Sequence, residues 1–258
     1  MKSQFSYANF SNLNYDTLLL AALMAEKEEN ELRFVDLFDG REEHRLTVPL
    51  GFEDCLGHPL RGDKDHFFER TKVRLAHLHG SATYWQSDST SCVKLSREVI
   101  KDPAMWRSLR MHEHEYRPCV VLTNSRLKRA AIEQQPFDLA YTKFAEAVHR
   151  SSRWLVIGYS FRDEPVNDVL RSELHRRRKD DDLPQVLVVS HGKRPTRPSI
   201  ELALGWTETD AHSESNRFAA SSDTWLKIDR DGAFGLQNRE VWAEFVDSDP
   251  EWPESSEW

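Results

Sequence analysis

Residues 153–174, with the sequence RWLVIGYSFRDEPVNDVLRSEL, restrict the folds available to this chain more than any other segment. The apolar run from Trp154 to Ile157 has the length of a buried strand and stops at Gly158. From Val166 the apolar side chains recur at helical spacing, and Pro165 suits the first turn of a helix, where its missing N–H group costs nothing. The segment therefore predicts a strand, a glycine turn and a helix.

Between this strand and the helix lies the turn Gly158-Tyr159-Ser160-Phe161, followed by Asp163 and Glu164 as candidate helix caps. In an open parallel sheet, ligands bind outside the carboxyl ends of the strands, close to the amides of the following helix. We therefore expect Gly158, Tyr159 and Ser160 to lie at a ligand-binding edge. A second apolar run, 186–189, ends at Ser190, which lies beside Gly158 if the two strands are neighbours.

Two further strand ends carry polar residues that suit catalysis. A weak strand pattern over residues 5–13 precedes Asn14 and Asp16, which are followed by an apolar helix. The alternating segment 72–81 predicts a strand ending at a glycine, with His79 at its end, and a histidine can accept a proton near neutral pH. The simpler alternatives are that Asn14 and Asp16 only cap the helix and that His79 is a structural histidine.

Strands that alternate with helices predict an α/β fold, Rossmann-like, with a mostly parallel sheet and flanking helices. We expect one domain over residues 1–240, with a loop-rich insertion at 30–70, where glycines and prolines recur. After Tyr84 the sequence predicts irregular structure before a helix near residue 104. Residues 241–258 form an acidic tail, because no lysine or arginine follows position 239.

The composition excludes several classes of protein. The 258 residues are 39% hydrophobic and 30% charged, which is typical of a soluble globular protein. A formal net charge of −8 argues against general nucleic-acid binding, and the basic run 176–179 fits the C-terminus of a helix. The apolar block 18–25 is too short to span a membrane. We expect a cytoplasmic protein with no membrane or direct nucleic-acid partner.

The three cysteines, Cys55, Cys92 and Cys119, lie far apart in the sequence and form no CxxC pair. This usage is typical of a reducing compartment and disfavours both a disulfide framework and a thiolate zinc site. We therefore expect no zinc and no other metal.

Three short motifs, each following an expected strand, resemble in their order the motifs of the sirtuin-like family of NAD-consuming domains. The resemblance covers roughly residues 5–195. Within the family, the chain is similar in particular to the branch found in bacterial anti-phage defence proteins. The three motifs are Asn14-Tyr15-Asp16, Leu78-His79-Gly80-Ser81 and Gly158-Tyr159-Ser160-Phe161.

The resemblance implies roles for these residues. Asn14 and His79 would carry catalysis, and Asp16 would hold the carboxamide of nicotinamide. The glycine turn would contact the ribose and phosphates of NAD, the substrate. The expected cofactor-binding residues of this turn and its neighbouring strand are Gly158, Tyr159, Ser160 and Ser190.

The chemistry of NAD cleavage suits these residue types independently. Nicotinamide leaves as a neutral molecule, so no strong general acid is needed at the leaving group. The reaction needs an anchored carboxamide, a positioned water or ribose, and a weak base. Asp16 can anchor, Asn14 offers both a donor and an acceptor, and His79 can take the proton.

Two features depart from the family. Sirtuin deacylases carry a four-cysteine zinc module, which three scattered cysteines cannot form, so simple NAD hydrolysis is favoured over protein deacylation. No glycine precedes Gly40, so the glycine-rich first βα unit of a dinucleotide-binding fold is missing. The chain is then a truncated product, a partial domain completed by another subunit, or a degenerate copy without turnover.

The functional prediction is an NAD+ glycohydrolase, acting as an anti-phage defence effector. Its expected partners are NAD+ and either another subunit of a defence system or a second copy of this chain. The alternative is a catalytically inactive nucleotide-sensing or assembly subunit with a sirtuin-like fold.

Overall fold

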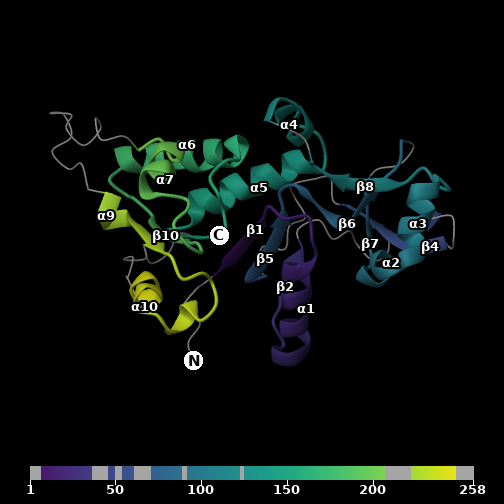
Figure 1. Cartoon of the computed structure of the whole chain (residues 1–258), viewed down its shortest axis with the longest axis horizontal. Helices are drawn as coiled ribbons and strands as arrows, with labels where there is room; N and C mark the ends of the chain where they lie inside the picture. The colour runs from purple at the N-terminus through teal and green to yellow at the C-terminus, as the bar shows by residue number, and fades with distance from the viewer. Residues whose placement is uncertain are drawn as a thin grey trace. The chain divides into compact units, whose positions relative to one another are not determined.

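The computed structural model describes residues 7–36, 46–49, 54–60, 71–88, 92–122, 125–206 and 222–247. The chain divides into two compact units, residues 1–144 and 145–258, and the division falls inside helix α5 (Phe137–Arg150) (Figure 1). Each unit has its own parallel sheet and its own buried core.

The first unit opens with a three-stranded, entirely parallel sheet in the order β1-β5-β2. Helix α1 packs against it, because Leu20 and Leu23 share a buried cluster with Leu75. The Asp16 carboxylate accepts a hydrogen bond from the amide of Leu18 at 2.9 Å, and Thr17 between them is the N-cap residue of the helix. The elements are β1 (Ala8–Asn12), α1 (Leu18–Asn30), β2 (Phe34–Asp36) and β5 (Val73–His77).

The other described strands of this unit form a five-stranded antiparallel sheet in the order β3-β4-β7-β6-β8. Helices α2 and α3 cover it, with Ile100 and Met105 packed in one cluster with Trp85. Helix α4 lies between this sheet and α5 in the chain. The elements are β3 (Leu46–Pro49), β4 (Asp54–Pro59), β6 (Gly80–Gln86), β7 (Val93–Leu95), α2 (Arg97–Lys101), α3 (Pro103–Met111), β8 (Arg117–Val120) and α4 (Ser125–Ile132).

The irregular structure predicted after Tyr84 is therefore wrong, since β6 and β7 occupy much of this segment. Ser81 and Thr83 are fully buried in β6, and their hydroxyls hydrogen-bond to each other at 2.9 Å. Because the strand buries polar side chains as well as apolar ones, its sequence lacks the alternation that marks a strand with one wet face.

The second unit contains another entirely parallel sheet, in the order β11-β10-β9. In Figure 1, α6 and α7 lie above β10 and α10 lies below it. The strand, glycine turn and helix predicted from the sequence are confirmed as β9 and α6. The elements are β9 (Arg153–Ile157), α6 (Glu164–Lys179), β10 (Gln185–Val189), α7 (Arg197–Ala203), α9 (Ser222–Trp225), β11 (Leu226–Asp229), η2 (Leu236–Asn238) and α10 (Glu240–Asp247).

Parallel sheets flanked by helices make this a mixed α/β protein of the Rossmann-like class that the sequence predicts. The predicted insertion 30–70 contains a hairpin, because β3 and β4 pair in antiparallel orientation. The acidic segment begins in α10, where Phe245 and Val246 are buried, and its residues 248–258 lie outside the described part of the chain.

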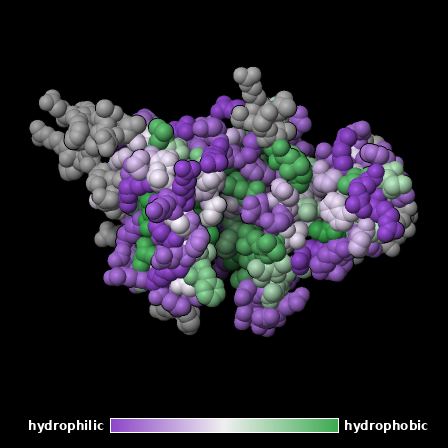
Figure 2. Space-filling view, in the orientation of Figure 1, coloured by the Kyte–Doolittle hydropathy of each residue, from purple (hydrophilic) through white to green (hydrophobic). Residues whose placement is uncertain are grey.

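Most of the surface in view in Figure 2 is hydrophilic, as the content of charged residues predicts. Large apolar side chains that do reach the surface include Leu155 and Ile157 on β9, an edge strand of its sheet. Among the described residues, no helix combines the length and the apolar character needed to cross a membrane.

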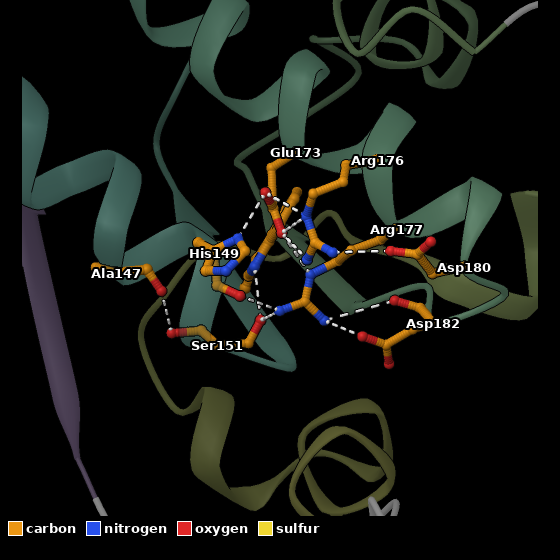
Figure 3. A network of polar contacts seen from close by, with 9 residues as sticks. Ala147, His149, Ser151, Glu173, Arg176, Arg177, Asp180 and Asp182 are labelled. Carbon is orange, nitrogen blue, oxygen red and sulfur yellow. Dashed lines mark hydrogen bonds and ion pairs between the residues drawn. The ribbon is translucent and has the colours of Figure 1, made fainter. Parts of the chain in front are cut away.

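A buried arginine fastens α6 to the segment that enters β9 (Figure 3). The Arg177 side chain is 5% exposed and donates to the backbone carbonyls of His149 at 2.6 Å and Ser151 at 3.0 Å. It also donates to the carboxylates of Glu173 and Asp182, each at 3.0 Å. Because all these acceptors surround one buried cation, their hydrogen bonds and ion pairs offset the free-energy cost of removing Arg177 from water.

Replacing Arg177 with methionine should lower the free energy of unfolding by about 3 kcal/mol or more, because it leaves two carbonyls and Glu173 without their buried donor. The matched control is Arg176→Met on the same helix, which also removes a donor to Glu173 but from a side chain that is 42% exposed. The control should lose clearly less stability. Urea denaturation of both variants measures the difference, and equal losses would contradict this account of Arg177.

Glu173 makes the same network sensitive to acid. Burial favours its neutral form, but hydrogen bonds from Arg176, His149 and Arg177 outweigh burial and lower the pKa of Glu173 from 4.5 to about 2. A carboxylate whose pKa is lower in the folded state than in the unfolded state stabilises the fold. This stabilisation is complete at a pH above the pKa of the unfolded state, and it is lost as the pH falls through the pKa of the folded state.

Between pH 4.5 and pH 2 the protein should therefore lose about 3 kcal/mol of stability that Glu173 supplies at neutral pH. The variant Glu173→Gln should be less stable at pH 7 but should show a flatter pH dependence through this window. Denaturation midpoints measured from pH 7 to pH 2 test this prediction, and parallel curves for the two proteins would refute it.

Candidate functional site

The three candidate residues of the first unit follow directly from the paired ends of two parallel strands. Asn12 ends β1 and His77 ends β5, and these two residues are register partners. Asn14 and Asp16 come next after β1, and His79 comes next after β5. The structure therefore brings the first two motifs together at the carboxyl edge of the sheet, where ligands bind in α/β folds.

Three hydrogen bonds join residues 12–15 to residues 78–82. The amide of Leu78 donates to the carbonyl of Asn12 at 2.9 Å, and the amide of Ala82 donates to the carbonyl of Tyr15 at 2.7 Å. Between them, Nδ1 of His79 lies 3.0 Å from the carbonyl oxygen of Leu13. The imidazole is thus hydrogen-bonded to Leu13, the residue that precedes Asn14.

These contacts fix the proton on the His79 ring. Because a carbonyl oxygen can only accept, Nδ1 must carry the proton that it shares with Leu13. In the neutral ring, Nε2 is then an acceptor, and the hydroxyl of Tyr141 lies 3.2 Å from it. His79 is 8% exposed. An imidazole with Nδ1 bound to a backbone carbonyl and Nε2 holding a lone pair is arranged as a general base.

Tyr141 was not predicted as a site residue. The sequence placed it on the apolar face of the helix that became α5, and nothing in its spacing points to a histidine in another part of the chain. Only the fold brings its hydroxyl to His79.

His79 lies in a turn rather than at the end of one long strand. The segment 72–81, predicted as a single strand, is divided, because β5 ends at His77 and β6 begins at Gly80. Gly80 has φ +82°, and a Cβ atom there would overlap the carbonyl oxygen of Cys119 in β8. Glycine is thus required by both conformation and space, and the sharp turn directs His79 toward Leu13.

Asn14 is exposed in the loop between β1 and α1, and its backbone N–H group donates to the side-chain oxygen of Asn12 at 3.1 Å. Asp16 is half-buried and already accepts the hydrogen bond from Leu18. A carboxylate has several acceptor positions, so capping the helix does not prevent Asp16 from binding a carboxamide N–H group as well.

A buried ionic cluster at the same sheet edge was not predicted. The Asp36 carboxylate, 1% exposed, accepts hydrogen bonds from Lys94 at 2.8 Å and from the Tyr84 hydroxyl at 3.1 Å. Nε2 of His77 lies 3.7 Å from the same carboxylate, and burial lowers the pKa of His77 despite the charge of Asp36. The cluster connects the parallel sheet to the antiparallel sheet, and its members come from four strands with no common spacing.

The candidate residues of the second unit also lie together. Ile157 of β9 pairs with Val189 of β10, and the amide of Gly158 donates to the carbonyl of Val189 at 2.9 Å. The two strands are therefore neighbours, and Gly158 and Ser190 follow them at one carboxyl edge. Gly158 has φ +65° and open space where a Cβ would stand.

The tyrosine of this turn is held from the following helix. The Tyr159 hydroxyl lies 2.7 Å from Oδ1 of Asn167 and 3.0 Å from the carbonyl of Asp163. Burial, together with the charge of Asp163, raises the pKa of Tyr159, so the hydroxyl stays protonated and acts as a donor. Ser160 is exposed, and Phe161 adopts φ +58°, with Asn167 donating to its carbonyl at 3.0 Å.

Ser190 is 5% exposed, and its hydroxyl accepts a hydrogen bond from Nη1 of Arg230 at 3.0 Å. Arg230 follows β11, the other neighbour of β10, and also donates to the carbonyl of Pro195 at 2.5 Å. The structure thus adds a cation to the edge predicted to face phosphates, and no motif or spacing in the sequence points to Arg230. Within the described ranges, no group of three or more histidine, cysteine, aspartate and glutamate side chains could hold a metal ion.

The protonation of His79 can be tested directly. Nitrogen-15 NMR of the histidine rings should show His79 with a protonated Nδ1 and an unprotonated Nε2, because Leu13 offers only an acceptor. Tyr141→Phe should shift the Nε2 resonance through loss of its hydrogen-bond donor and leave the tautomer unchanged. Tyr7→Phe, at a 45% exposed tyrosine, is the control. A protonated Nε2 in the parent protein would disprove the assignment.

The family model described as SIR2-like domain matches residues 9–208, a range that contains all the candidate residues of both units. No curated protein matches the chain. The sirtuin-like resemblance is confirmed at the level of the family, and the defence branch and the missing first βα unit stay predictions. The chain belongs to the family of SIR2-like domains.

Proposed function

We propose that the protein is an NAD+ glycohydrolase that releases nicotinamide and ADP-ribose. One observation carries the proposal: three hydrogen bonds join residues 12–15 to residues 78–82, and the bond between Nδ1 of His79 and Leu13 leaves Nε2 as the acceptor nitrogen of the ring. NAD enters the proposal through the sirtuin-like resemblance of the three motifs.

The reaction breaks the bond between C1′ of the ribose and the ring nitrogen of nicotinamide. The bonding electrons stay with the nitrogen, so the positively charged pyridinium leaves as neutral nicotinamide. Water forms the new bond to C1′ and transfers its proton to Nε2 of His79. Asn14 positions the water or the ribose through its amide, and Asp16 accepts a hydrogen bond from the carboxamide.

Tyr141 affects the proton transfer, because in the structure its hydroxyl lies 3.2 Å from Nε2 of His79, the atom that would accept the proton. Substrate water has to replace the hydroxyl or pass its proton through it. Either route keeps the ring in one orientation before the substrate arrives, which reduces the entropy lost in reaching the reactive geometry.

The resemblance also assigns cofactor-binding roles to the turn after β9, and the groups of the second unit at this turn are described by themselves. Gly158 and Ser160 offer backbone and a hydroxyl at an exposed turn, and the Tyr159 hydroxyl holds this turn by donating to Asn167 and Asp163. Ser190 and Arg230 add a hydroxyl and a guanidinium at the same sheet edge. A cation and several donors at a strand–helix turn suit ribose and phosphate oxygens.

The biological role that we propose is that of an effector in anti-phage defence, where loss of NAD+ would stop the infected cell. A further subunit of the defence system or a second copy of this chain would control the activity. The rival proposal is a nucleotide-sensing or assembly subunit without turnover.

The activity is tested by incubating the purified protein with NAD+ and measuring free nicotinamide. If turnover occurs, Asn14→Ala and His79→Ala should each reduce it by about 100-fold or more, because each removes a group that acts on the reacting atoms. The matched control is His175→Ala, at an exposed histidine on α6, which should keep full activity. Circular dichroism verifies that all variants are folded.

Retained activity in both site variants would refute the assignment of Asn14 and His79. Calorimetry distinguishes the rival: binding of NAD+ or ADP-ribose without release of nicotinamide would support a nucleotide-sensing subunit. Absence of both binding and turnover would contradict the two proposals together.

A further inference from the structure

Asn12, the last residue of β1, is hydrogen-bonded to a member of each of the first two motifs, although no motif in the sequence includes it. Its backbone carbonyl accepts a hydrogen bond from the amide of Leu78 at 2.9 Å. Its side-chain oxygen Oδ1 accepts a hydrogen bond from the backbone N–H group of Asn14 at 3.1 Å. One residue thus holds both the segment that leads into His79 and the backbone of Asn14.

The bond between the Asn12 side chain and Asn14 follows the pattern of an Asx-turn, in which an asparagine oxygen accepts from the N–H group two residues further on. Asn14 is exposed, and within the described part of the chain the structure gives it no other hydrogen bond. The Asn12 side chain is therefore the group that restricts the Asn14 backbone. Because the Asn14 side chain extends from this backbone, the same bond limits the positions that its amide group can take.

The contacts that orient His79 are independent of the Asn12 side chain. The amide of Leu78 donates to the backbone carbonyl of Asn12, and Nδ1 of His79 donates to the backbone carbonyl of Leu13. A substitution at position 12 removes neither carbonyl. The position of Asn14 can therefore be changed while the imidazole keeps its own hydrogen bond.

The Asn12 side chain also has an unfavourable effect on stability. Its Nδ2 atom is buried and has no hydrogen-bond partner among the described residues. A buried donor without a partner destabilises a fold. A smaller side chain would lose the bond to Asn14 but would also remove this donor, so the two effects oppose each other. Stability alone therefore does not explain an asparagine at this position.

We propose that Asn12 is a positioning residue of the candidate site, whose side chain holds Asn14 in place while the backbone of the same segment holds His79. Asn12 acts on the reaction through Asn14, to which its side chain is bonded. The effect on turnover rests on the function proposed above, whereas the restriction of Asn14 can be measured without substrate. Two experiments test these two parts separately.

Hydrogen exchange measured by NMR tests the restriction of Asn14. In Asn12→Ala the Asn14 amide loses its acceptor and should exchange several times faster than in the parent protein. Asn12→Ser should restore slow exchange, because a serine hydroxyl can also accept from the amide two residues further on. The control is Asn9→Ala, at an exposed asparagine of the same strand, which should leave the exchange unchanged. Equal exchange of the Asn14 amide in the parent and in Asn12→Ala would overturn the inference.

Steady-state kinetics with NAD+ tests the effect on the reaction. Asn12→Ala should lower kcat about 10-fold and leave KM nearly unchanged, because a displaced Asn14 weakens the transition state more than the bound substrate. Asn12→Ser should regain most of the lost kcat, and Asn9→Ala should match the parent protein. The nitrogen-15 resonances of the His79 ring should be the same in all four proteins, because Leu13 remains its partner.

The outcomes separate this inference from the proposed function. Absence of turnover in the parent protein overturns the glycohydrolase proposal, and the exchange of the Asn14 amide then decides whether Asn12 restricts it. If the parent turns over NAD+ and Asn12→Ala has the same kcat, the positioning role is overturned and the glycohydrolase proposal stands. A lower kcat together with displaced His79 resonances would show a general disturbance of the site and would also overturn the positioning role.

Discussion

The hydrogen bond from His79 to the carbonyl of Leu13 is the contact on which the candidate site of the first unit depends. It needs the ends of β1 and β5 to be in register and a left-handed residue directly after the histidine. Gly80 provides the second condition, and the strand β8 presses against it where any side chain would overlap. The antiparallel sheet is thus more than an insertion, because one of its strands fixes the direction of a side chain at the edge of the parallel sheet.

The second unit reaches a similar result by different means. Its turn has two left-handed residues, Gly158 and Phe161, and only the first is a glycine. A left-handed phenylalanine costs free energy, and the structure compensates this with the Asn167 side chain, which donates to the Phe161 carbonyl and contacts the Tyr159 hydroxyl. Because Asn167 lies in the first turns of α6 and is 1% exposed, the helix itself holds the turn in place.

The local elements could be predicted from the sequence because their signals are local. The strand, turn and helix from Arg153 to Lys179 follow from a change of apolar period at a glycine, and the helix 137–150 follows from its apolar face. The parallel neighbours β9 and β10 were expected from the α/β pattern. In the site, the sequence predicted which motifs follow which strands, and the register of β1 with β5 explains why two of them meet.

The contacts that were missed are long-range. Tyr141 belongs to a helix whose pattern shows only an apolar face, and Arg230 follows a strand in the last part of the chain. The strand β6 was missed for a different reason, since its buried polar side chains remove the alternation on which the prediction of a strand depends, and β7 has only three residues.

Two histidines stand near the same sheet edge, and the structure distinguishes their chemistry. His77 is 1% exposed, and burial lowers its pKa, so it is held neutral inside the protein beside the Asp36 and Lys94 pair. Its role is to pack against that cluster, where an added proton would be costly. His79 has its Nδ1 proton committed to a backbone carbonyl and its other nitrogen facing a hydroxyl. Of the two rings, only that of His79 is oriented by a hydrogen bond so that a proton can be accepted at a defined atom, Nε2, which is why the proposed chemistry is assigned to it.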